Sequence, residues 1–180
     1  MSTVEPIRKL KDLEKVRRVL RSTNFRDYLL FTLGINSGLR VGDILALNVG
    51  DVKDKSYIEL TEKKTGKFKR IPINSKLKPM IEEFTRDKKP NEPLFVSCRH
   101  HRLDRIMAYN IIKEACRKAG IEEKVGTHTM RKTFGYHHYQ RYNNIAMLQK
   151  MFNHSSMEIT LRYIGIDQEQ IYYSYNNFIL

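Results

Sequence analysis

Apolar residues recur along most of this chain with the spacing of amphipathic helices. Near the start, one helical face among lysines and arginines is formed by Leu13, Val16, Val19 and Leu20. Polar residues separate the periodic segments, and Thr23 or Asn24 offers an N-cap to the apolar run that follows it. The pattern predicts helices over residues 11–21, 25–36, 41–47, 76–87, 104–119, 128–141, 144–152 and 156–163.

Two segments near the middle alternate apolar and polar residues instead, with the period of a half-buried strand. They are residues 56–61 and 68–73, and the turn between them contains Gly66. Two alternating runs joined by a short glycine-containing turn predict an antiparallel hairpin. Because helices are predicted on both sides of it, the expected fold class is mainly α with a small antiparallel β-sheet, an α+β arrangement.

The balance of charge favours a polyanionic partner. The 180-residue chain has 33 Lys and Arg against 20 Asp and Glu, a formal net charge of +13. Composition alone leaves nucleic-acid binding and an unspecialised basic protein equally open. Cys98 and Cys116 lie in unrelated contexts without zinc-ligand spacing, so a reduced, cytoplasmic chain is expected. No apolar run approaches the ~18 residues of a membrane span, and no membrane association is expected.

Six residues bear the groups that chemistry at a phosphodiester needs. A tyrosine can attack phosphorus and form a covalent intermediate. Arginine forks match the non-bridging oxygens, where charge grows in the transition state. A lysine on a turn can protonate the leaving 5′ oxygen, and a histidine and an arginine three apart present to the same side of a helix. These six candidate residues are Arg40, Lys64, His128, Arg131, His154 and Tyr163.

Each candidate residue also has an ordinary interpretation when it is taken alone. Tyr163 is one of ten tyrosines, and a lone tyrosine near a helix end is usually a half-buried core residue. Lys64 can belong to a solvated basic turn that only touches phosphates. His154 can cap or pack before a helix. Backbone-phosphate contact or a solvated face is expected for three further residues of the helix at 128–141, namely Lys132, His137 and His138.

The order and context of the six candidate residues resemble the catalytic domain of the tyrosine recombinase, or phage-integrase, family. The family's order is Arg, Lys, His-x-x-Arg, His or Trp, and then Tyr, which this chain follows. Family-like residues surround them, with Gly-Leu before Arg40, Thr-Gly after Lys64 and Ser-Ser after His154. The resemblance covers roughly residues 17–164.

The resemblance implies a reaction in which Tyr163 forms a 3′-phosphotyrosine and releases a 5′-hydroxyl. A 5′-hydroxyl from a partner duplex then rejoins the strands without ATP, a metal ion or another cofactor. Lys64 is the implied general acid, and His128 is implied to assist proton transfer at Tyr163. The residues implied to hold the phosphate are Arg40, Arg131 and His154.

The resemblance also implies a domain arrangement and partners. Residues 1–164 are expected to form the catalytic domain, and residues 165–180, which contain no Lys or Arg, a tail or helix that docks on a neighbouring protomer. The family's separate N-terminal core-binding domain is expected to be absent. The expected partner is double-stranded DNA, bound by a homo-oligomer that forms a tetramer on two paired sites, with a monomer as the alternative in the absence of DNA.

Two other functions stay open on the residues alone. One is a type-IB topoisomerase-like nicking and rejoining activity, which has similar chemistry. The other is a non-catalytic DNA-binding regulator that keeps a relic of the site. In a regulator of that kind, Tyr163→Phe would leave every measurable activity unchanged.

Overall fold

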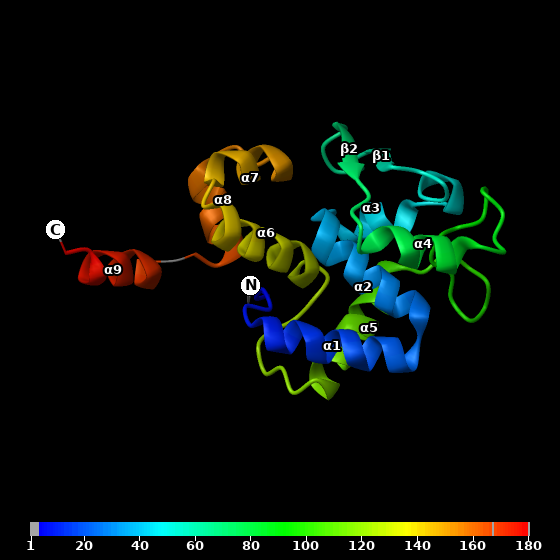
Figure 1. Cartoon of the computed structure of the whole chain (residues 1–180), viewed down its shortest axis with the longest axis horizontal. Helices are drawn as coiled ribbons and strands as arrows, with labels where there is room; N and C mark the ends of the chain where they lie inside the picture. Colours follow the sequence, from blue (N-terminus) through cyan, green and yellow to red (C-terminus); the bar gives the residue numbers. More distant parts are fainter. Residues whose placement is uncertain (1–3, 167, 180) are drawn as a thin grey trace.

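The computed structural model describes residues 4–166 and 168–179, and this part of the chain consists of helices with one small hairpin at its edge (Figure 1). The strands β1 (Tyr57–Thr61) and β2 (Phe68–Pro72) are antiparallel, with Ile58 opposite Ile71. The predicted fold class is therefore confirmed. The helices are α1 (Leu10–Thr23), α2 (Phe25–Ser37), α3 (Val41–Ala46), α4 (Leu77–Thr85), α5 (Arg105–Lys118), α6 (Thr129–Tyr142), α7 (Ile145–Phe152), α8 (Met157–Ile164) and α9 (Gln168–Asn177), with a 3-10 turn η1 at Val49–Asp51.

Local capping residues set the limits of these elements, and each predicted helix and strand agrees with the structure to within two residues at each end. The Asn24 side chain accepts a hydrogen bond from the backbone N–H of Arg26 and starts α2. The Asp104 carboxylate accepts from the backbone N–H of Met107 at 2.7 Å and starts α5. Gly38 ends α2 in the left-handed conformation, with a φ of 63°.

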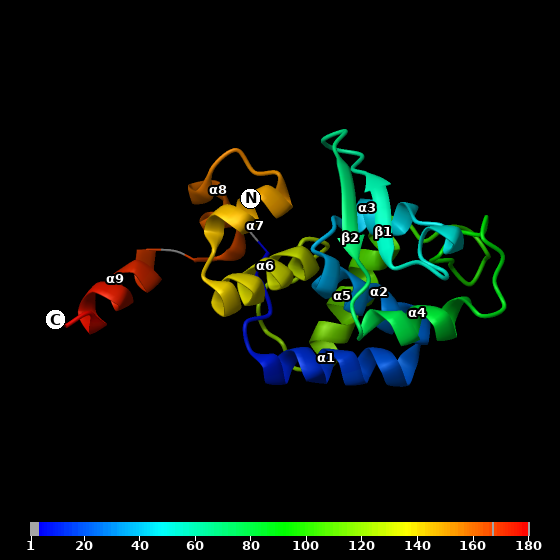
Figure 2. The ribbon, with the colours of Figure 1, turned by 45° about the horizontal axis from the view of Figure 1, so that its top comes forward.

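The main core is centred on α2, whose side chains Leu29, Leu30, Phe31 and Leu33 are fully buried. This helix contacts α1, α4 and α6, as expected for a helix that is apolar around most of its circumference. The hairpin projects from the body beside α3 (Figure 2), and Ile58 of β1 is buried against the main core. The end of α2 and the start of α3 therefore lie next to the hairpin.

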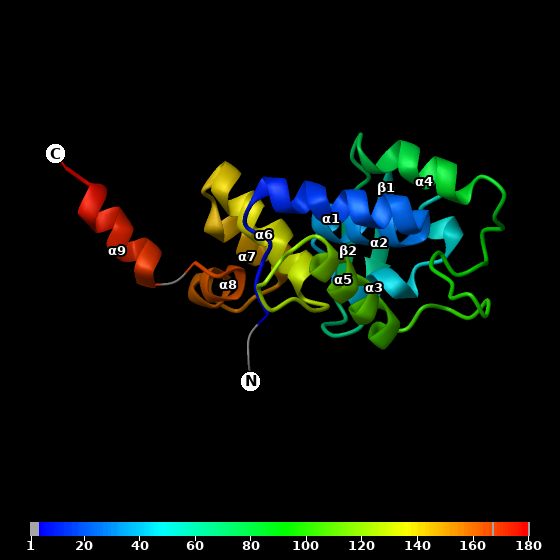
Figure 3. The ribbon, with the colours of Figure 1, turned by 90° about the horizontal axis from the view of Figure 1, so that it is seen from below.

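A second cluster of apolar side chains forms where α7 and α8 pack together, and its buried members are Leu148, Phe152 and Ile164. Helix α6 contacts α2 on one side and α7 and α8 on the other (Figure 3). Gly135 of α6 makes the second contact close, because a Cβ there would lie 2.6 Å from Cγ2 of Ile164. Helix α6 thus joins the main core to the second cluster.

The last helix, α9, extends away from the rest of the described chain (Figure 1). Residues 1–3 of the expected catalytic domain, and residues 167 and 180 of the expected tail, lie outside the described residues. Across the described part of the chain, no helix is long and apolar enough to cross a membrane. The large apolar side chains that are exposed on α9 and in the two residues after it are Tyr172, Tyr173, Tyr175, Phe178 and Ile179.

Candidate active site

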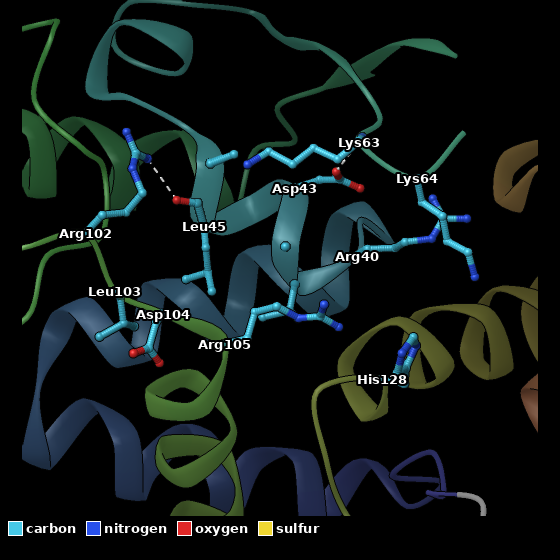
Figure 4. A pocket seen from close by; sticks show the side chains of 13 residues that line it. Arg40, Asp43, Leu45, Lys63, Lys64, Arg102, Leu103, Asp104, Arg105 and His128 are labelled. Atoms are coloured by element: carbon cyan, nitrogen blue, oxygen red, sulfur yellow. Dashed lines mark hydrogen bonds between the residues drawn. The ribbon is translucent and has the colours of Figure 1, made fainter. Parts of the chain in front are cut away.

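The six candidate residues converge from three parts of the fold. Arg40 precedes α3, Lys64 lies on the hairpin turn, and the other four lie between the N-cap of α6 and the last turn of α8. Arg40, Lys64 and His128 line one cavity of about 730 Å³ (Figure 4). Arg105 at the start of α5 lines the same cavity, so its walls are strongly basic.

Tyr163 lies in the last turn of α8, with its ring against Phe152 and His154 at centroid distances of 5.6 and 5.1 Å. Its Oη lies 3.1 Å from Nδ1 of His128, which precedes it by 35 residues in the sequence. Burial raises the pKa of Tyr163, and the nearby Arg131 opposes that rise. The hydroxyl is therefore protonated at neutral pH and has a proton acceptor within hydrogen-bond distance.

The imidazole of His128 is suited to accept that proton. Burial lowers the pKa of His128, and the positive charges of Arg131 and Arg105 lower it further. The neutral ring at pH 7 carries a free lone pair on one nitrogen. His128 is the N-cap residue of α6, so the position of its ring relative to Tyr163 depends on how α6 packs on α8.

Arg131 is the largest fully buried side chain of the described residues and is 2% exposed. Its Nη1 donates to the carbonyl of Gly38 at 2.6 Å and its Nη2 to the carbonyl of Phe152 at 2.9 Å. The guanidinium carbon also lies 4.2 Å from the centre of the Phe152 ring, within cation–π range. These contacts fix the orientation of the guanidinium between the main core and the second cluster.

His154 follows Asn153, which ends α7 in the left-handed conformation with a φ of 53°. Nδ1 of His154 lies 3.1 Å from Oγ1 of Thr160, whose hydroxyl donates to the carbonyl of Ser156. Since that hydroxyl proton is already used, Nδ1–H of His154 must be the donor. Burial and the nearby Arg131 lower the pKa of His154 to about 4, so the ring is neutral at pH 7.

Arg40 adjoins an acidic residue, Glu62, that the sequence places only in the hairpin turn. The Glu62 side chain is 0% exposed, and Arg40 Nη1 lies 2.8 Å from its Oε1 in an ion pair without hydrogen-bond geometry. Oε1 also lies 3.1 Å from Nζ of Lys69 and 3.9 Å from Nη1 of Arg131. One buried carboxylate oxygen therefore faces three cations.

The second oxygen of Glu62 is held by hydrogen bonds. Oε2 accepts from Oγ1 of Thr65 at 2.6 Å and from Nδ2 of Asn153 at 2.9 Å. Burial on its own raises the pKa of Glu62, but these hydrogen bonds and the nearby Lys69 and Arg40 lower it to about 2. The only sequence signal for this site is a single acidic residue among the lysines of the hairpin turn.

Two lysines lie where the sequence did not place them. Lys69 of β2, one of several basic residues near Lys64 in the sequence, turns inward, donates to the carbonyl of Met151 and has a pKa lowered by burial. Lys132 was expected on a solvated or phosphate-contacting face, which is wrong, because α6 is packed on two sides and leaves it 4% exposed. Its Nζ lies 5.3 Å from the centre of the Tyr163 ring.

The two histidines of α6 also depart from the predicted face. Nε2 of His137 lies 2.9 Å from the carbonyl of Ile7, in the segment before α1. His138 packs between the rings of Phe134 and Tyr142, at centroid distances of 5.6 and 4.8 Å. Both side chains are half-buried by these contacts, so neither lies on a fully solvated face, and their contact with backbone phosphates stays a prediction.

The buried Glu62 predicts that stability falls in acid. Its pKa is about 2 in the folded chain and 4.5 ordinarily, so the ionised form stabilises the fold above pH 4.5 and this contribution is lost as the pH falls towards 2. The difference is on the order of 3 kcal/mol. In Glu62→Gln, the free energy of unfolding from urea titrations should fall less between pH 5 and 2.5 than in the wild type. Equal pH dependences would contradict the prediction.

Relatives of the chain are found among recombinases. The probable integrase/recombinase YoeC of Bacillus subtilis is 50% identical over 179 residues, which cover 99% of this chain and 98% of YoeC. A tyrosine recombinase of Pseudothermotoga lettingae is 30% identical over 151 residues, which cover 82% of this chain and 52% of that protein. The chain thus spans nearly all of YoeC but about half of the second relative.

Solved structures of recombinases share the fold. The crystal structure of XerA recombinase superposes with a TM-score of 0.78 at 22% identity, over 99% of this chain and 68% of that one. The pre-cleavage complex of XerH site-specific recombinase with its difH substrate gives a TM-score of 0.74 at 19% identity, over 98% of this chain and 54% of that one. The model of the phage integrase family matches residues 8–170. With that match over most of its length and a half-identical integrase/recombinase among its relatives, this chain belongs to the phage integrase family of tyrosine recombinases.

Proposed function

We propose that this chain is a site-specific DNA recombinase that cleaves and rejoins strands through a 3′-phosphotyrosine on Tyr163. The observation that carries the proposal is the contact of the Tyr163 hydroxyl with His128, 3.1 Å away, beside the buried guanidinium of Arg131. A nucleophile, a proton acceptor and a fixed cation thus meet at one point. The net charge of +13 and the likeness to XerH on its DNA substrate support duplex DNA as the partner.

In the first step, the Tyr163 oxygen forms a bond to the scissile phosphorus and the bond from phosphorus to the 5′ oxygen breaks. The tyrosine proton passes to Nδ1 of His128, and Lys64 gives a proton to the leaving 5′ oxygen. Ionising a tyrosine at pH 7 without help costs about 4 kcal/mol, from its ordinary pKa near 10. Proton transfer to His128 and the positive charge of Arg131 reduce that cost.

Charge on the non-bridging oxygens grows as phosphorus becomes five-coordinate. Arg40 and Arg131 carry permanent charge and are positioned before DNA binds, so they stabilise this transition state more than the ground state. His154 is a neutral ring whose Nδ1–H is committed to Thr160. Since the neutral ring has only that one N–H, a hydrogen bond from Nε2 to the phosphate requires the protonated imidazolium. A bound phosphate favours the imidazolium because its negative charge raises the pKa of His154.

The second step reverses the first with a different strand. A 5′-hydroxyl of a partner duplex attacks the phosphotyrosine, a new bond from phosphorus to the 5′ oxygen forms, and the tyrosine is released. One phosphodiester is exchanged for another, and side chains supply the cations, so we propose that neither ATP nor a metal ion is needed.

Strand exchange between two duplexes needs several protomers. We propose that residues 1–164 form the catalytic domain and that residues 165–180 dock on a neighbouring protomer of a tetramer on DNA. The support is the position of α9, which extends from the body with exposed Tyr172, Tyr173 and Tyr175. An exposed aromatic segment of this kind is typical of a protein–protein contact.

Trapping the covalent intermediate tests the proposal. Duplexes that carry a nick within randomised sequence let the short strand with the 5′-hydroxyl leave after cleavage, so the adduct accumulates. In EDTA, the wild type should form an SDS-resistant protein–DNA adduct, and Tyr163→Phe should form none because it lacks the attacking oxygen. Tyr57→Phe, which changes an exposed tyrosine of β1, is the control and should react like the wild type. An adduct with Tyr163→Phe, or no adduct with the wild type, would contradict the proposal.

The role of Lys64 predicts rescue by a better leaving group. A cleavable sequence is first selected from the randomised duplexes, and its duplex is then made with sulfur in place of the bridging 5′ oxygen. The pKa of a thiol is near 8.5, so the sulfur can leave as a thiolate without receiving a proton. Lys64→Ala should slow cleavage of the normal substrate by about 10²–10⁴ and leave the sulfur substrate close to the wild-type rate. Lys67→Ala, at an exposed position of the same turn, should change neither rate at saturating DNA. Equal slowing on both substrates would rule out general acid catalysis by Lys64.

A further inference from the structure

The six candidate residues are divided between two apolar bodies. Arg40 and the hairpin that carries Lys64 belong with the main core. Tyr163 packs on the second cluster, beside His154. A reaction that needs all six groups within one phosphate's reach therefore depends on how these two bodies are held together.

Glu62 and Lys69 connect the hairpin to the second cluster. Oε2 of Glu62 accepts a hydrogen bond from the side chain of Asn153, the residue between α7 and His154. Lys69 of β2 donates to the carbonyl of Met151 in the last turn of α7. The hairpin that carries Lys64 and the end of α7 before His154 are thus joined by two polar contacts, one from each member of the Glu62–Lys69 ion pair.

Charge explains why a carboxylate stands at this point. Arg40, Arg131 and Lys69 surround Oε1 of Glu62 within 3.9 Å. Three cations so close together repel one another, and a buried carboxylate offsets that repulsion. Three positive charges against one negative charge leave an excess of two, which suits a phosphodiester with its single negative charge.

We propose that Glu62 is a positioning residue for the strand-cleavage reaction: its carboxylate orients Arg40 toward the phosphate and, with Asn153 and Lys69, holds the hairpin against the end of α7. It touches neither the phosphate nor the reacting atoms. The inference rests on the proposed function, since the groups that Glu62 positions are those of that reaction.

Hydrogen exchange of the DNA-free protein tests the connection independently of any DNA substrate. The amides of Glu62, Lys63 and Gly66 are hydrogen-bonded within the turn or to Asp43. Glu62→Gln should make these amides exchange about five- to tenfold faster than in the wild type. Glu59→Gln, which changes an exposed glutamate of β1, is the matched control and should leave them unchanged.

A second variant keeps this test decisive if Glu62→Gln does not fold. Asn153 occupies a left-handed backbone position that glycine adopts without strain, so Asn153→Gly removes the amide contact and leaves Glu62 charged. It should also speed exchange of the hairpin amides. Unchanged exchange in both variants would overturn the connection, whatever the DNA assays show.

The effect on Arg40 is tested with a substrate in which the scissile phosphate is a neutral methylphosphonate. On normal DNA, Glu62→Gln should lower the cleavage rate at saturating DNA about 10- to 100-fold, with the Kd for DNA unchanged or lower. A merely structural defect would affect both substrates equally, whereas misplacement of Arg40 matters less when the phosphate carries no charge. The defect on methylphosphonate DNA should therefore shrink to within about threefold.

The outcomes separate the two proposals. A wild-type protein that forms no adduct contradicts the proposed function. A wild-type adduct with an equal rate in Glu62→Gln, or an equal defect of this variant on both substrates, contradicts the positioning of Arg40 alone.

Discussion

A buried guanidinium at the junction of two apolar bodies is the interaction on which the site depends. An uncompensated arginine at the position of Arg131 would cost several kcal/mol. Two backbone carbonyls offset that cost, those of Gly38 and Phe152, at the ends of α2 and α7. Carbonyls at helix ends lack intrahelical partners, so they are free to accept from it. Arg131, which is proposed to bind the phosphate, therefore also holds the main core and the second cluster in position relative to each other.

The electrostatic state of the DNA-free site follows from that burial. Arginine stays charged even where it is desolvated, whereas burial and neighbouring cations keep His128 and His154 neutral and Tyr163 protonated. Glu62 balances part of the positive charge. The site is thus positively charged and has a neutral base beside its nucleophile, which is the state that an incoming phosphodiester requires.

Much of the fold could be predicted because the signals are local. Helix periodicity, the caps Asn24 and Asp104 and the glycine of the hairpin turn act over a few residues, and they placed each predicted element to within two residues. The six candidate residues could be grouped from their order and context, and the fold brings them together. Their catalytic roles follow from the proposed reaction.

The features that the sequence did not predict depend on contacts between segments that are far apart in the chain. Glu62 and Lys69 look like members of a solvated turn, and only the approach of α7 to the hairpin buries them. Lys132 and His137 lie on a helix that packs on two sides, which a single helical face cannot indicate. The φ of 53° at Asn153 is a left-handed conformation that comes from the end of α7, and no periodic pattern in the sequence indicates it.

The most direct test of the central claim is to identify the atom that holds the DNA. Mass spectrometry of the digested wild-type adduct should find one peptide, containing Tyr163, with a nucleotide linked through its 3′ phosphate to the phenolic oxygen. Attachment at another residue, or through a 5′ phosphate, would contradict the account.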